Sequence, residues 1–394
     1  MITPIESRSV SSRIPLADFK PHLAGFMLGD LDFDPVASIK YGYLFHALER
    51  LYGPIRVFDI SLRGPERWWN GLRMFHPNLR RWKERYYKNL EAFVARSRKG
   101  ARLLRNLRGN VDIAIQIGVL FGVSWDASIQ VPVVIYTDYT ARLSAEDPYR
   151  FRAPLKGTQL AKWFDYEGQV YHRAAHIFVR SELIRVDIVN RYGVPSEKVS
   201  VVGGGVNFDP LPVAPLRGPK KDPIILFIGS EFFRKGGDLL LRAFAIVRKS
   251  FPSARLRILT RDDIPADLPM DGVDVIPYVW DRSQIARLYE DVDLFVLPSR
   301  QETWGDVVLE AAAYCLPCIG TRGQAMDEII KDGETGLLVP RENIEYLAEA
   351  ILHLLRDTNF RLHMGLTARK RAESFFTWDH VAARMAPVID SILI

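Results

Sequence analysis

The first half of the chain alternates short apolar runs with longer segments of helical periodicity. Apolar runs of four to six residues predict strands at 23–28, 55–60, 113–117, 131–136, 176–180 and 199–202. Between them, residues 38–51 and 160–174 carry apolar side chains at helical spacing. Strands that alternate with helices in this way are typical of a parallel sheet covered by helices on both faces. The pattern therefore predicts an α/β domain of the Rossmann type over residues 1–215.

A proline-rich segment then interrupts the alternation. Five of the fifteen residues of Asp209–Pro223 are proline, which removes backbone donors and breaks helices and strands alike. We interpret this segment as a linker between domains. Beyond it we expect strands at 224–228, 255–259, 273–276, 294–297 and 318–320, and helices at 237–250, 283–289 and 306–314. Residues 216–375 are thus predicted to form a second Rossmann-like domain, with ligands bound at the carboxyl ends of the strands.

The composition is that of a globular chain. Of the 394 residues 48% are apolar and 25% charged, which excludes wholesale disorder. Two cysteines are too few for a disulfide framework and indicate a reducing compartment. Residues 1–20 lack an apolar signal core, and no stretch reaches 18 uninterrupted apolar residues. The sequence therefore predicts a soluble, cytoplasmic protein.

The most informative stretch is Leu297–Tyr314, where a predicted strand ends and a predicted helix begins near Gly305. Glu302 precedes this helix, and Glu310 lies about 7.5 Å along its axis. Free amides at a helix start attract anions, and carboxylates accept hydrogen bonds from sugar hydroxyls. We expect a diphosphate at the amides of Gly305, Asp306 and Val307, with one attached group toward each glutamate. That arrangement suits a nucleotide-sugar.

A second strand, loop and helix span Phe227–Gly237. The glycines of this loop permit close backbone approach to a ligand. Arg234 and Lys235 carry charge that offsets that of a phosphate. The spacing is not that of a Walker loop.

These motifs resemble those of family 4 retaining glycosyltransferases of the GT-B fold (glycosyl transferases group 1). Glu302 and Glu310 match that family's two glutamates separated by seven residues. Its phosphate loop is matched by Gly229, Lys235 and Gly236, its "NGV" turn by residues 203–207, and its "G.TG.LVP" segment by residues 333–340. The resemblance covers most of residues 165–380, and before about residue 110 it depends on architecture alone.

The resemblance implies two Rossmann-like domains whose parallel sheets face each other across a cleft. Residues 1–215 would bind the acceptor and residues 216–375 the nucleotide-sugar. Residues 376–394 would form a helix, Trp378–Leu393, that crosses back to the N-terminal domain.

The resemblance also implies a transfer of a sugar from a nucleotide diphosphate donor to an acceptor hydroxyl with retention of configuration. Glu310 would bind the ribose, Glu302 would contact the donor sugar, and Lys235 would neutralise the leaving diphosphate. The other implied donor-binding residues are Gly229, Ser230, Gly236, Thr303, Trp304, Gly305, Asp306, Val307, Tyr278 and Gly205. Apart from the donor we expect no cofactor and no metal.

Three positions depart from the family pattern. Ser230 stands where the family often has an arginine, and we expect Arg234 to supply the missing charge. The family's N-terminal histidine has no match, and Asp138, which follows the strand 131–136, is the candidate at its place. Asp306 stands where an apolar residue is common, and its carboxylate would repel phosphate unless it points outward.

Positive charge is concentrated in residues 63–108, which hold fourteen basic and three acidic residues, whereas the whole chain has a net charge of +6. Basic and aromatic side chains recur there at helical spacing: Arg81, Arg85, Lys88, Phe93, Arg96 and Lys99. This pattern favours an interfacial helix on anionic lipid, a solvated helix face being the alternative. No nucleic-acid recognition module accompanies it. The candidate acceptor or membrane contacts are Gly29, Asp30, Arg80, Arg81, Lys83, Arg85 and Lys88.

The sequence thus predicts a glycosyltransferase of cell-envelope glycolipid or polysaccharide synthesis, peripheral on the inner face of the membrane. Its partners would be a nucleotide-sugar donor and a glycan or lipid-linked acceptor, and not nucleic acid. Two alternatives remain: a nucleotide-sugar 2-epimerase, and a sugar-nucleotide-binding or membrane scaffold protein that has lost the reaction. Cys315 and Cys318 have CxxC spacing, but two cysteines make only half a zinc site, so we favour packing.

Overall fold

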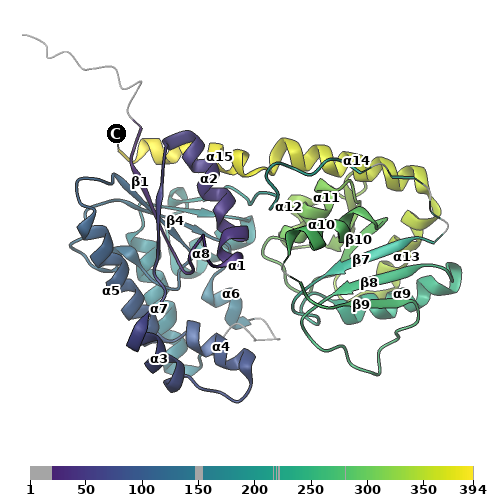
Figure 1. The fold of residues 1–394 in the computed structure, drawn as a ribbon, viewed down its shortest axis with the longest axis horizontal. Coiled ribbons are helices and arrows are strands. Elements are labelled where there is room, and N and C mark those ends of the chain that lie inside the picture. Colours follow the sequence, from purple (N-terminus) through teal and green to yellow (C-terminus); the bar gives the residue numbers. More distant parts are fainter. Residues whose placement is uncertain are drawn as a thin grey trace, which may run out of the picture.

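The computed structural model describes residues 20–146, 154–215, 217–218, 220, 222–279 and 281–393. Within these residues the chain forms two six-stranded sheets, one from each half of the sequence (Figure 1). The strand order is β2-β1-β3-β4-β5-β6 in the first sheet and β12-β11-β10-β7-β8-β9 in the second. Neighbouring strands run parallel in both, as the alternation of strands and helices predicts. The predicted α/β class is confirmed.

The strands are short runs of mostly buried apolar residues. Those of the first sheet are β1 (Leu23–Met27), β2 (Arg56–Asp59), β3 (Ile113–Ile117), β4 (Val133–Thr137), β5 (His176–Val179) and β6 (Val199–Val201). Those of the second are β7 (Ile224–Ile228), β8 (Arg255–Leu259), β9 (Val273–Ile276), β10 (Leu294–Leu297), β11 (Cys318–Thr321) and β12 (Gly336–Val339). The predicted strands agree to within two residues, because strands buried on both faces leave continuous apolar runs. β12, inside the motif at 333–340, was not predicted as a strand.

Helices cover both sheets. Those of the N-terminal half are α1 (Pro35–Ala37), α2 (Tyr43–Tyr52), α3 (Gly64–Arg73), α4 (Leu79–Tyr87), α5 (Leu90–Asn106), α6 (Ala141–Glu146), α7 (Gly157–Arg173) and α8 (Glu182–Tyr192). The remainder are α9 (Gly237–Ser250), α10 (Arg282–Glu290), α11 (Asp306–Ala313), α12 (Met326–Ile329), α13 (Ile344–Arg356), α14 (Thr358–Phe375) and α15 (Trp378–Ser391). The helix predicted at 38–51 is instead a π-helical turn, Ser38–Gly42, followed by α2. Short 3₁₀ turns lie at Val123–Trp125 and Ser196–Lys198.

Side-chain caps fix where several of these helices begin. In each case an Asn, Asp or Thr side chain accepts a hydrogen bond from the amide three residues later, which satisfies an otherwise unpaired helical donor. The capping residues are Asn78, Asn89, Asp281, Asn343, Asp357 and Thr377. In the described part of the chain, no helix is both long and apolar enough to cross a lipid bilayer.

Each sheet has a point where the chain reverses its direction of growth. In the first, β1 pairs with both β2 and β3, and in the second, β7 pairs with both β8 and β10. The connections diverge at such a point and leave a crevice beyond the carboxyl ends of the strands, where ligands of open α/β sheets bind. The phosphate loop predicted after β7 and the motif predicted after β10 begin at the same crevice.

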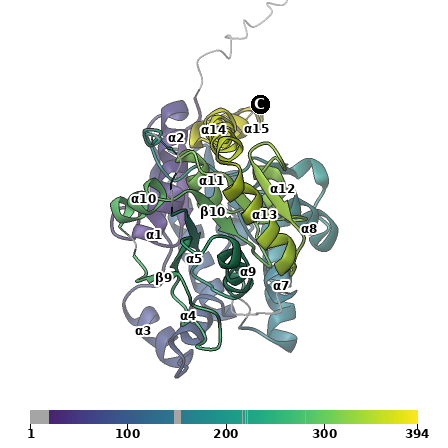
Figure 2. The same ribbon diagram turned by 90° about the vertical axis from the view of Figure 1, so that its right-hand side faces the viewer.

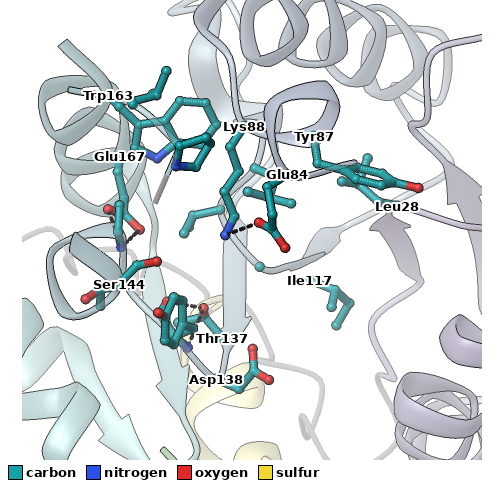
Figure 3. A pocket seen from close by; sticks show the side chains of 18 of the residues that line it. Leu28, Glu84, Tyr87, Lys88, Ile117, Thr137, Asp138, Ser144, Trp163 and Glu167 are labelled. Carbon is teal, nitrogen blue, oxygen red and sulfur yellow. Dashed lines mark hydrogen bonds and ion pairs between the residues drawn. The ribbon is translucent and has the colours of Figure 1, made fainter. Parts of the chain in front are cut away.

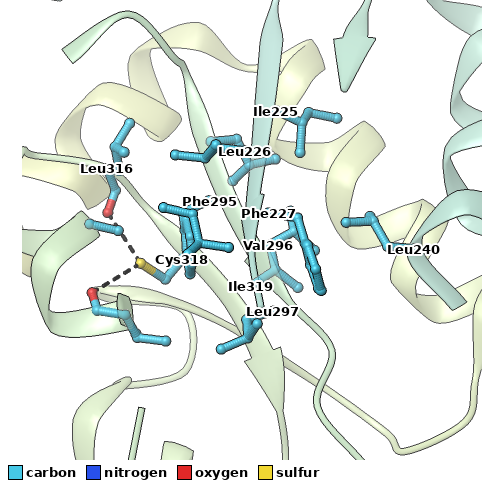
Figure 4. Close-up of a cluster of buried hydrophobic side chains, with 14 of the residues drawn as sticks. Ile225, Leu226, Phe227, Leu240, Phe295, Val296, Leu297, Leu316, Cys318 and Ile319 are labelled. Atoms are coloured by element: carbon cyan, nitrogen blue, oxygen red, sulfur yellow. Dashed lines mark hydrogen bonds between the residues drawn. The ribbon is translucent and has the colours of Figure 1, made fainter. Parts of the chain in front are cut away.

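The core of the C-terminal half is a closely packed apolar cluster (Figure 4). Phe227 of β7, Phe295 and Val296 of β10, and Ile319 of β11 are wholly buried within it. The Cys318 thiol lies there too, 3.6 Å from the Val308 carbonyl oxygen. Cys315 and Cys318 are both free thiols, so Cys318 acts as a small core residue.

The last two helices lie along one side of both halves of the molecule (Figures 1 and 2). α14 packs on α11 of the C-terminal half, whereas α15 packs on α2 of the N-terminal half. Trp378, Met385 and Ile389 of α15 are buried in the same apolar cluster as β1 and β3. The ring of Trp378 lies against Gly205, where a Cβ atom would come within 2.5 Å of it.

This contact predicts that Gly205→Ala destabilises the protein. Since a methyl group at Gly205 would overlap the buried Trp378 ring, we expect the free energy of unfolding to fall by about 1–3 kcal/mol. Denaturant unfolding followed by tryptophan fluorescence measures the change. Gly218→Ala is the matched control, because a Cβ atom there meets nothing within 4 Å. Equal stability of the two variants would contradict the packing described.

Candidate functional site

A cavity of about 200 Å³ lies between the two sheets, at the carboxyl ends of β7 and β10. The C-terminal half contributes residues 228–230, 234–235 and 301–307, together with Tyr278. The N-terminal half contributes Lys40, Asp138, Tyr139 and Arg180. The two stretches singled out in the sequence therefore meet in one place, and the N-terminal half closes the cavity over them.

Lys235 and Glu302 face each other inside this cavity. Gly236 has a φ of +74°, and a side chain there would overlap the Pro298 carbonyl, so glycine lets the loop after β7 cross the end of β10. The crossing places the Lys235 ammonium in an ion pair with the Glu302 carboxylate. Glu302 is buried and also accepts a hydrogen bond of 3.3 Å from the Ser299 hydroxyl. The two predicted catalytic side chains thus form a pair.

Arg234 lines the cavity, but its guanidinium is already compensated. It donates a hydrogen bond of 2.6 Å to Glu231 and one of 2.7 Å to the Gln301 carbonyl oxygen. It is buried, so this pairing offsets the cost of removing its charge from water. The expectation that Arg234 supplies the charge missing at Ser230 therefore stays a prediction, with that charge shared with Glu231. Arg234 also joins the two loops that carry the site.

The Asp306 carboxylate, in the first turn of α11, is ion-paired with a residue of the N-terminal half. Its carboxylate accepts a hydrogen bond of 2.8 Å from Arg180, which follows β5 in the N-terminal half. Arg180 is only 1% exposed, and its Nε donates to the Tyr136 hydroxyl at 3.0 Å. Burial opposes the charge of Arg180, but Asp306 and neighbouring groups more than offset this, and the pKa of Arg180 is raised. The amides that begin α11 can thus face an anion although Asp306 is acidic.

Lys40 and Asp138 form a second ion pair, on the N-terminal side of the cavity. Lys40 comes from the π-helical turn before α2, and Asp138 follows β4. Burial opposes the lysine charge, but Asp138, Tyr41 and Asp306 together more than offset this effect, so the pKa of Lys40 is raised. Asp138 therefore lies where the sequence placed it, next to a lysine that the sequence reading did not single out.

Glu310 lies behind the cavity wall rather than on it. The buried carboxylate is 3.2 Å from Arg282 of α10 and accepts a hydrogen bond of 3.0 Å from the Tyr289 hydroxyl. Arg282 in turn donates to the Asn207 carbonyl oxygen at 2.8 Å and stacks on Phe208. Burial raises the pKa of Glu310, an effect that Arg282 opposes. A ribose bound by Glu310 would have to share this carboxylate with Arg282.

Comparison with known proteins finds a family that the C-terminal half resembles. Residues 214–371 match the family described as "Glycosyl transferases group 1". This part of the chain is thus similar to a group 1 glycosyltransferase domain. Two curated relatives are named D-inositol 3-phosphate glycosyltransferase. The one from Kineococcus radiotolerans is 31% identical over 53% of this chain and 55% of its own length, and the one from Kribbella flavida is 28% identical over the same shares. The chain spans about half the length of these relatives.

Solved structures extend the likeness to the whole fold. Sucrose-phosphate synthase from Thermosynechococcus elongatus superposes with a TM-score of 0.67 at 18% identity, over 94% of this chain and 99% of its own. HepE from Anabaena in complex with UDP-glucose gives a TM-score of 0.64 at 13% identity, over 94% of this chain and 99% of its own. At such identities the likeness shows the fold alone. The predicted GT-B architecture is confirmed.

The residues that line the cavity differ in part from the donor-binding residues predicted from the sequence. Gly229, Ser230, Thr303, Gly305 and Val307 line the cavity as expected. Gly205 does not line it, because its backbone packs against Trp378. Trp304 lines the cavity but is 3% exposed, and its ring packs on Phe376 and on Gly203 and Gly204. Tyr278 lies at the cavity edge under the Arg261 guanidinium.

The predicted acceptor contacts separate into several groups. Gly29 and Asp30 do not line the cavity between the sheets: the Gly29 amide donates to Asp59 and Ser61, and the Asp30 carbonyl oxygen accepts from the Asp34 amide. The Arg80 guanidinium forms ion pairs with the carboxylates of Glu231 and Asp262 in the C-terminal half, at N–O distances of 2.9 and 3.0 Å. Lys83 and Lys88 line a second cavity, at the N-terminal sheet. Arg81 is exposed on α4 and Arg85 half-buried.

The second half of the basic segment is not an interfacial helix. Phe93 of α5 is wholly buried in the N-terminal core, and Arg96 is 1% exposed and donates 2.7 Å to the Tyr87 carbonyl oxygen. Lys99 donates to the Ser61 carbonyl oxygen. The helical spacing of these residues therefore reflects packing of α5 on the sheet.

A buried carboxylate, that of Glu167, accepts hydrogen bonds at the end of the loop that carries Asp138. Both oxygens of Glu167 on α7 accept from the Ala141 amide, at 3.0 and 3.1 Å, and the Tyr171 hydroxyl donates at 3.2 Å. The Tyr192 hydroxyl of α8 donates to the same carboxylate. Burial, opposed by these hydrogen bonds, raises the pKa of Glu167 to about 7. No group of three or more metal-ligating His, Cys, Asp or Glu side chains occurs among the residues that the structure covers.

The raised pKa predicts a pH-dependent loss of stability. Because folded Glu167 binds its proton more tightly than the unfolded chain does, ionisation costs folding energy, and stability falls as the pH rises from about 4.5 to 7. Glu167→Gln removes this titration. We expect the stability of the wild type minus that of the variant to be greater at pH 5 than at pH 8. Urea unfolding at both pH values measures it. A difference that is independent of pH would contradict the assignment.

Proposed function

We propose that the chain transfers a sugar from a nucleoside diphosphate donor to an acceptor hydroxyl. The observation that carries this proposal is the convergence of positive groups on one cavity: the Lys235 ammonium, the start of α11 and the Arg180 guanidinium. One nitrogen of Arg180, Nη2, is buried and has no hydrogen-bond partner within the described chain. These groups suit the negative charge that develops on a leaving diphosphate, and we propose that they neutralise it without a metal ion.

The comparisons support this proposal. The curated relatives carry glycosyltransferase names, and HepE is described in complex with UDP-glucose. We therefore propose UDP-sugars as the first donors to test. A role in cell-envelope glycolipid or polysaccharide synthesis agrees with the surface features described below.

We further propose that the transfer retains the configuration of the sugar. The bond from the anomeric carbon to the diphosphate oxygen breaks, and the acceptor oxygen bonds to that carbon on the same face while its proton passes to the departing nucleoside diphosphate. The three carboxylates among the described residues that line the cavity are ion-paired: Asp138 with Lys40, Glu302 with Lys235, and Asp306 with Arg180. Pairing makes each a weaker nucleophile, which favours attack by the acceptor over a covalent intermediate on the protein.

The outer tip of the N-terminal half suits attachment to an anionic membrane. In α3 a polar residue is buried and apolar residues face water, which is the opposite of the usual arrangement in a surface helix. Asn70 is its buried residue, whereas Trp68 and Trp69 are 75% and 67% exposed. Leu72, Phe75 and Leu79 are exposed beside them. Exposed apolar side chains with surrounding arginines match the interfacial region of anionic lipid. α3 and α4 project at the end of the molecule away from α15 (Figures 1 and 2).

The proposed reaction predicts that Lys235→Met loses at least about 100-fold in transfer rate, since it removes charge stabilisation of the leaving diphosphate. Glu310→Gln keeps the hydrogen-bonding shape and is expected to raise KM for the donor. Thermal shifts with UDP, GDP, ADP and CMP identify the nucleotide, and labelled-sugar transfer with NMR of the product's anomeric configuration measures the reaction. Lys249→Met, on the exposed end of α9, is the matched control.

The alternatives give different outcomes. Near-normal transfer by Lys235→Met would contradict the proposed site. A nucleotide that stabilises the wild type without any transfer or donor hydrolysis would favour a binding or scaffold protein. Release of free nucleotide without an acceptor, together with an epimerised sugar, would favour the 2-epimerase.

The exposed tip predicts co-sedimentation with phosphatidylglycerol vesicles at low salt and little with phosphatidylcholine vesicles. The double variant Trp68→Ser, Trp69→Ser is expected to lose most of this binding, because it removes the apolar anchor. Tyr346→Ser with Leu366→Ser is the matched control, since both residues are exposed on other helices. Failure of the wild type to bind anionic vesicles would refute membrane attachment and leave the transfer reaction unaffected.

A further inference from the structure

A second and larger cavity, of about 460 Å³, lies at the carboxyl ends of β1, β3 and β4 (Figure 3). It shares Lys40, Asp138 and Tyr139 with the cavity between the sheets. A group bound in this second cavity is therefore next to the place proposed for the donor sugar. The proposed donor contacts do not account for it, since apart from Asp138 and Arg180 they lie on the other side of the cleft, and Arg180 does not line this second cavity.

Most of the wall of this second cavity is apolar. The loop after β3 contributes Ile117, Val119 and Leu120, and α7 contributes Leu160 and Trp163. A small and wholly polar acceptor would leave these side chains in contact with water, whereas an apolar group placed there removes area on both surfaces from water. The wall therefore selects for a ligand that has an apolar portion.

Nine of the described Lys, Asp, Glu, Ser and Thr residues also line this cavity, among them Asp138 and Ser144. The Ser144 hydroxyl is buried and has no hydrogen-bond partner in the described part of the chain. An unsatisfied buried hydroxyl costs free energy, which a ligand that bonds to it recovers. Lys88 and Glu84 of α4 pair with each other at 3.0 Å. Asp138 and Ser144 thus give the cavity a polar end beside apolar walls.

We propose that this cavity binds an amphipathic acceptor, with its reacting hydroxyl near Asp138 and an alkyl or aryl group against Leu160 and Trp163. This inference deepens the transfer reaction proposed above and rests on it for the word acceptor. The apolar group has two possible sources, the acyl chain of a lipid and the aromatic ring of a free small molecule. Both have the chemistry that the wall selects.

Binding of matched glucosides tests the proposal without any donor. Octyl β-glucoside below its micelle concentration, phenyl β-glucoside and methyl β-glucoside carry the same sugar and differ only in the apolar group. Isothermal titration of the full chain is expected to give at least tenfold tighter binding for octyl or phenyl than for methyl. Preference for octyl indicates an acyl chain, and preference for phenyl an aromatic ring.

Two variants separate binding from folding. Leu160 is half-buried on α7, and Leu160→Gln is expected to abolish the tenfold preference for the octyl or phenyl glucoside over the methyl glucoside. Leu366 is exposed on α14, and Leu366→Gln is expected to retain that preference. Ser144→Ala removes an unpaired hydroxyl, so we expect unchanged or higher stability but weaker binding of all three glucosides by about threefold or more. A structural role for Ser144 would lower stability instead, and would count against the proposal.

Equal affinities of the wild type for the three glucosides would overturn the proposal, as would a preference that Leu160→Gln leaves intact. Transfer activity is measured separately with the donor present. If the glucosides bind as expected but no nucleoside diphosphate sugar supports transfer, the proposed function fails while the apolar cavity stands. If transfer occurs but the preference is absent, the proposed function stands and the proposed acceptor cavity fails.

Discussion

The ion pair between Arg180 and Asp306 joins the two halves of the molecule at the cavity. Arg180 follows a strand of the N-terminal sheet, is removed from water, and pairs with Asp306 at the first turn of a helix in the C-terminal half. Arg180 is the buried partner, so the loss of Asp306 would leave a charge inside the protein uncompensated, which is costly. The pair therefore favours the relative position of the halves in which the cavity is enclosed.

The other charged groups of the cavity follow the same rule. Lys40 with Asp138 and Lys235 with Glu302 place one pair on each side of the cleft. Each pair holds its side chains in fixed positions, so a diphosphate bound beside them would share partners that are already present. The positive groups proposed to neutralise the diphosphate are therefore paired rather than isolated charges.

Much of the fold could be predicted because each buried strand is a local apolar run, and the motifs at 227–237 and 297–314 lie within a few residues of a strand end. The residues that were missed come from elsewhere: Lys40 from an irregular turn, Arg282 from the start of α10, and Arg180 from the N-terminal sheet. Arg180 ended a predicted strand, but its partner Asp306 lies 126 residues away. The direction of α5's basic face could not be read either, since helical spacing alone does not say which face is covered.

The return of α15 to the N-terminal half has a consequence for synthesis. Residues 378–391 complete the apolar cluster around β1 and β3. They are nevertheless synthesised after the sheet of the C-terminal half and its helices α9–α14. Until then the face of the N-terminal half that receives Trp378 and Met385 stays open to water and to other nascent chains. The C-terminal half can pack its own core earlier, so the half that begins first is the one that finishes folding last.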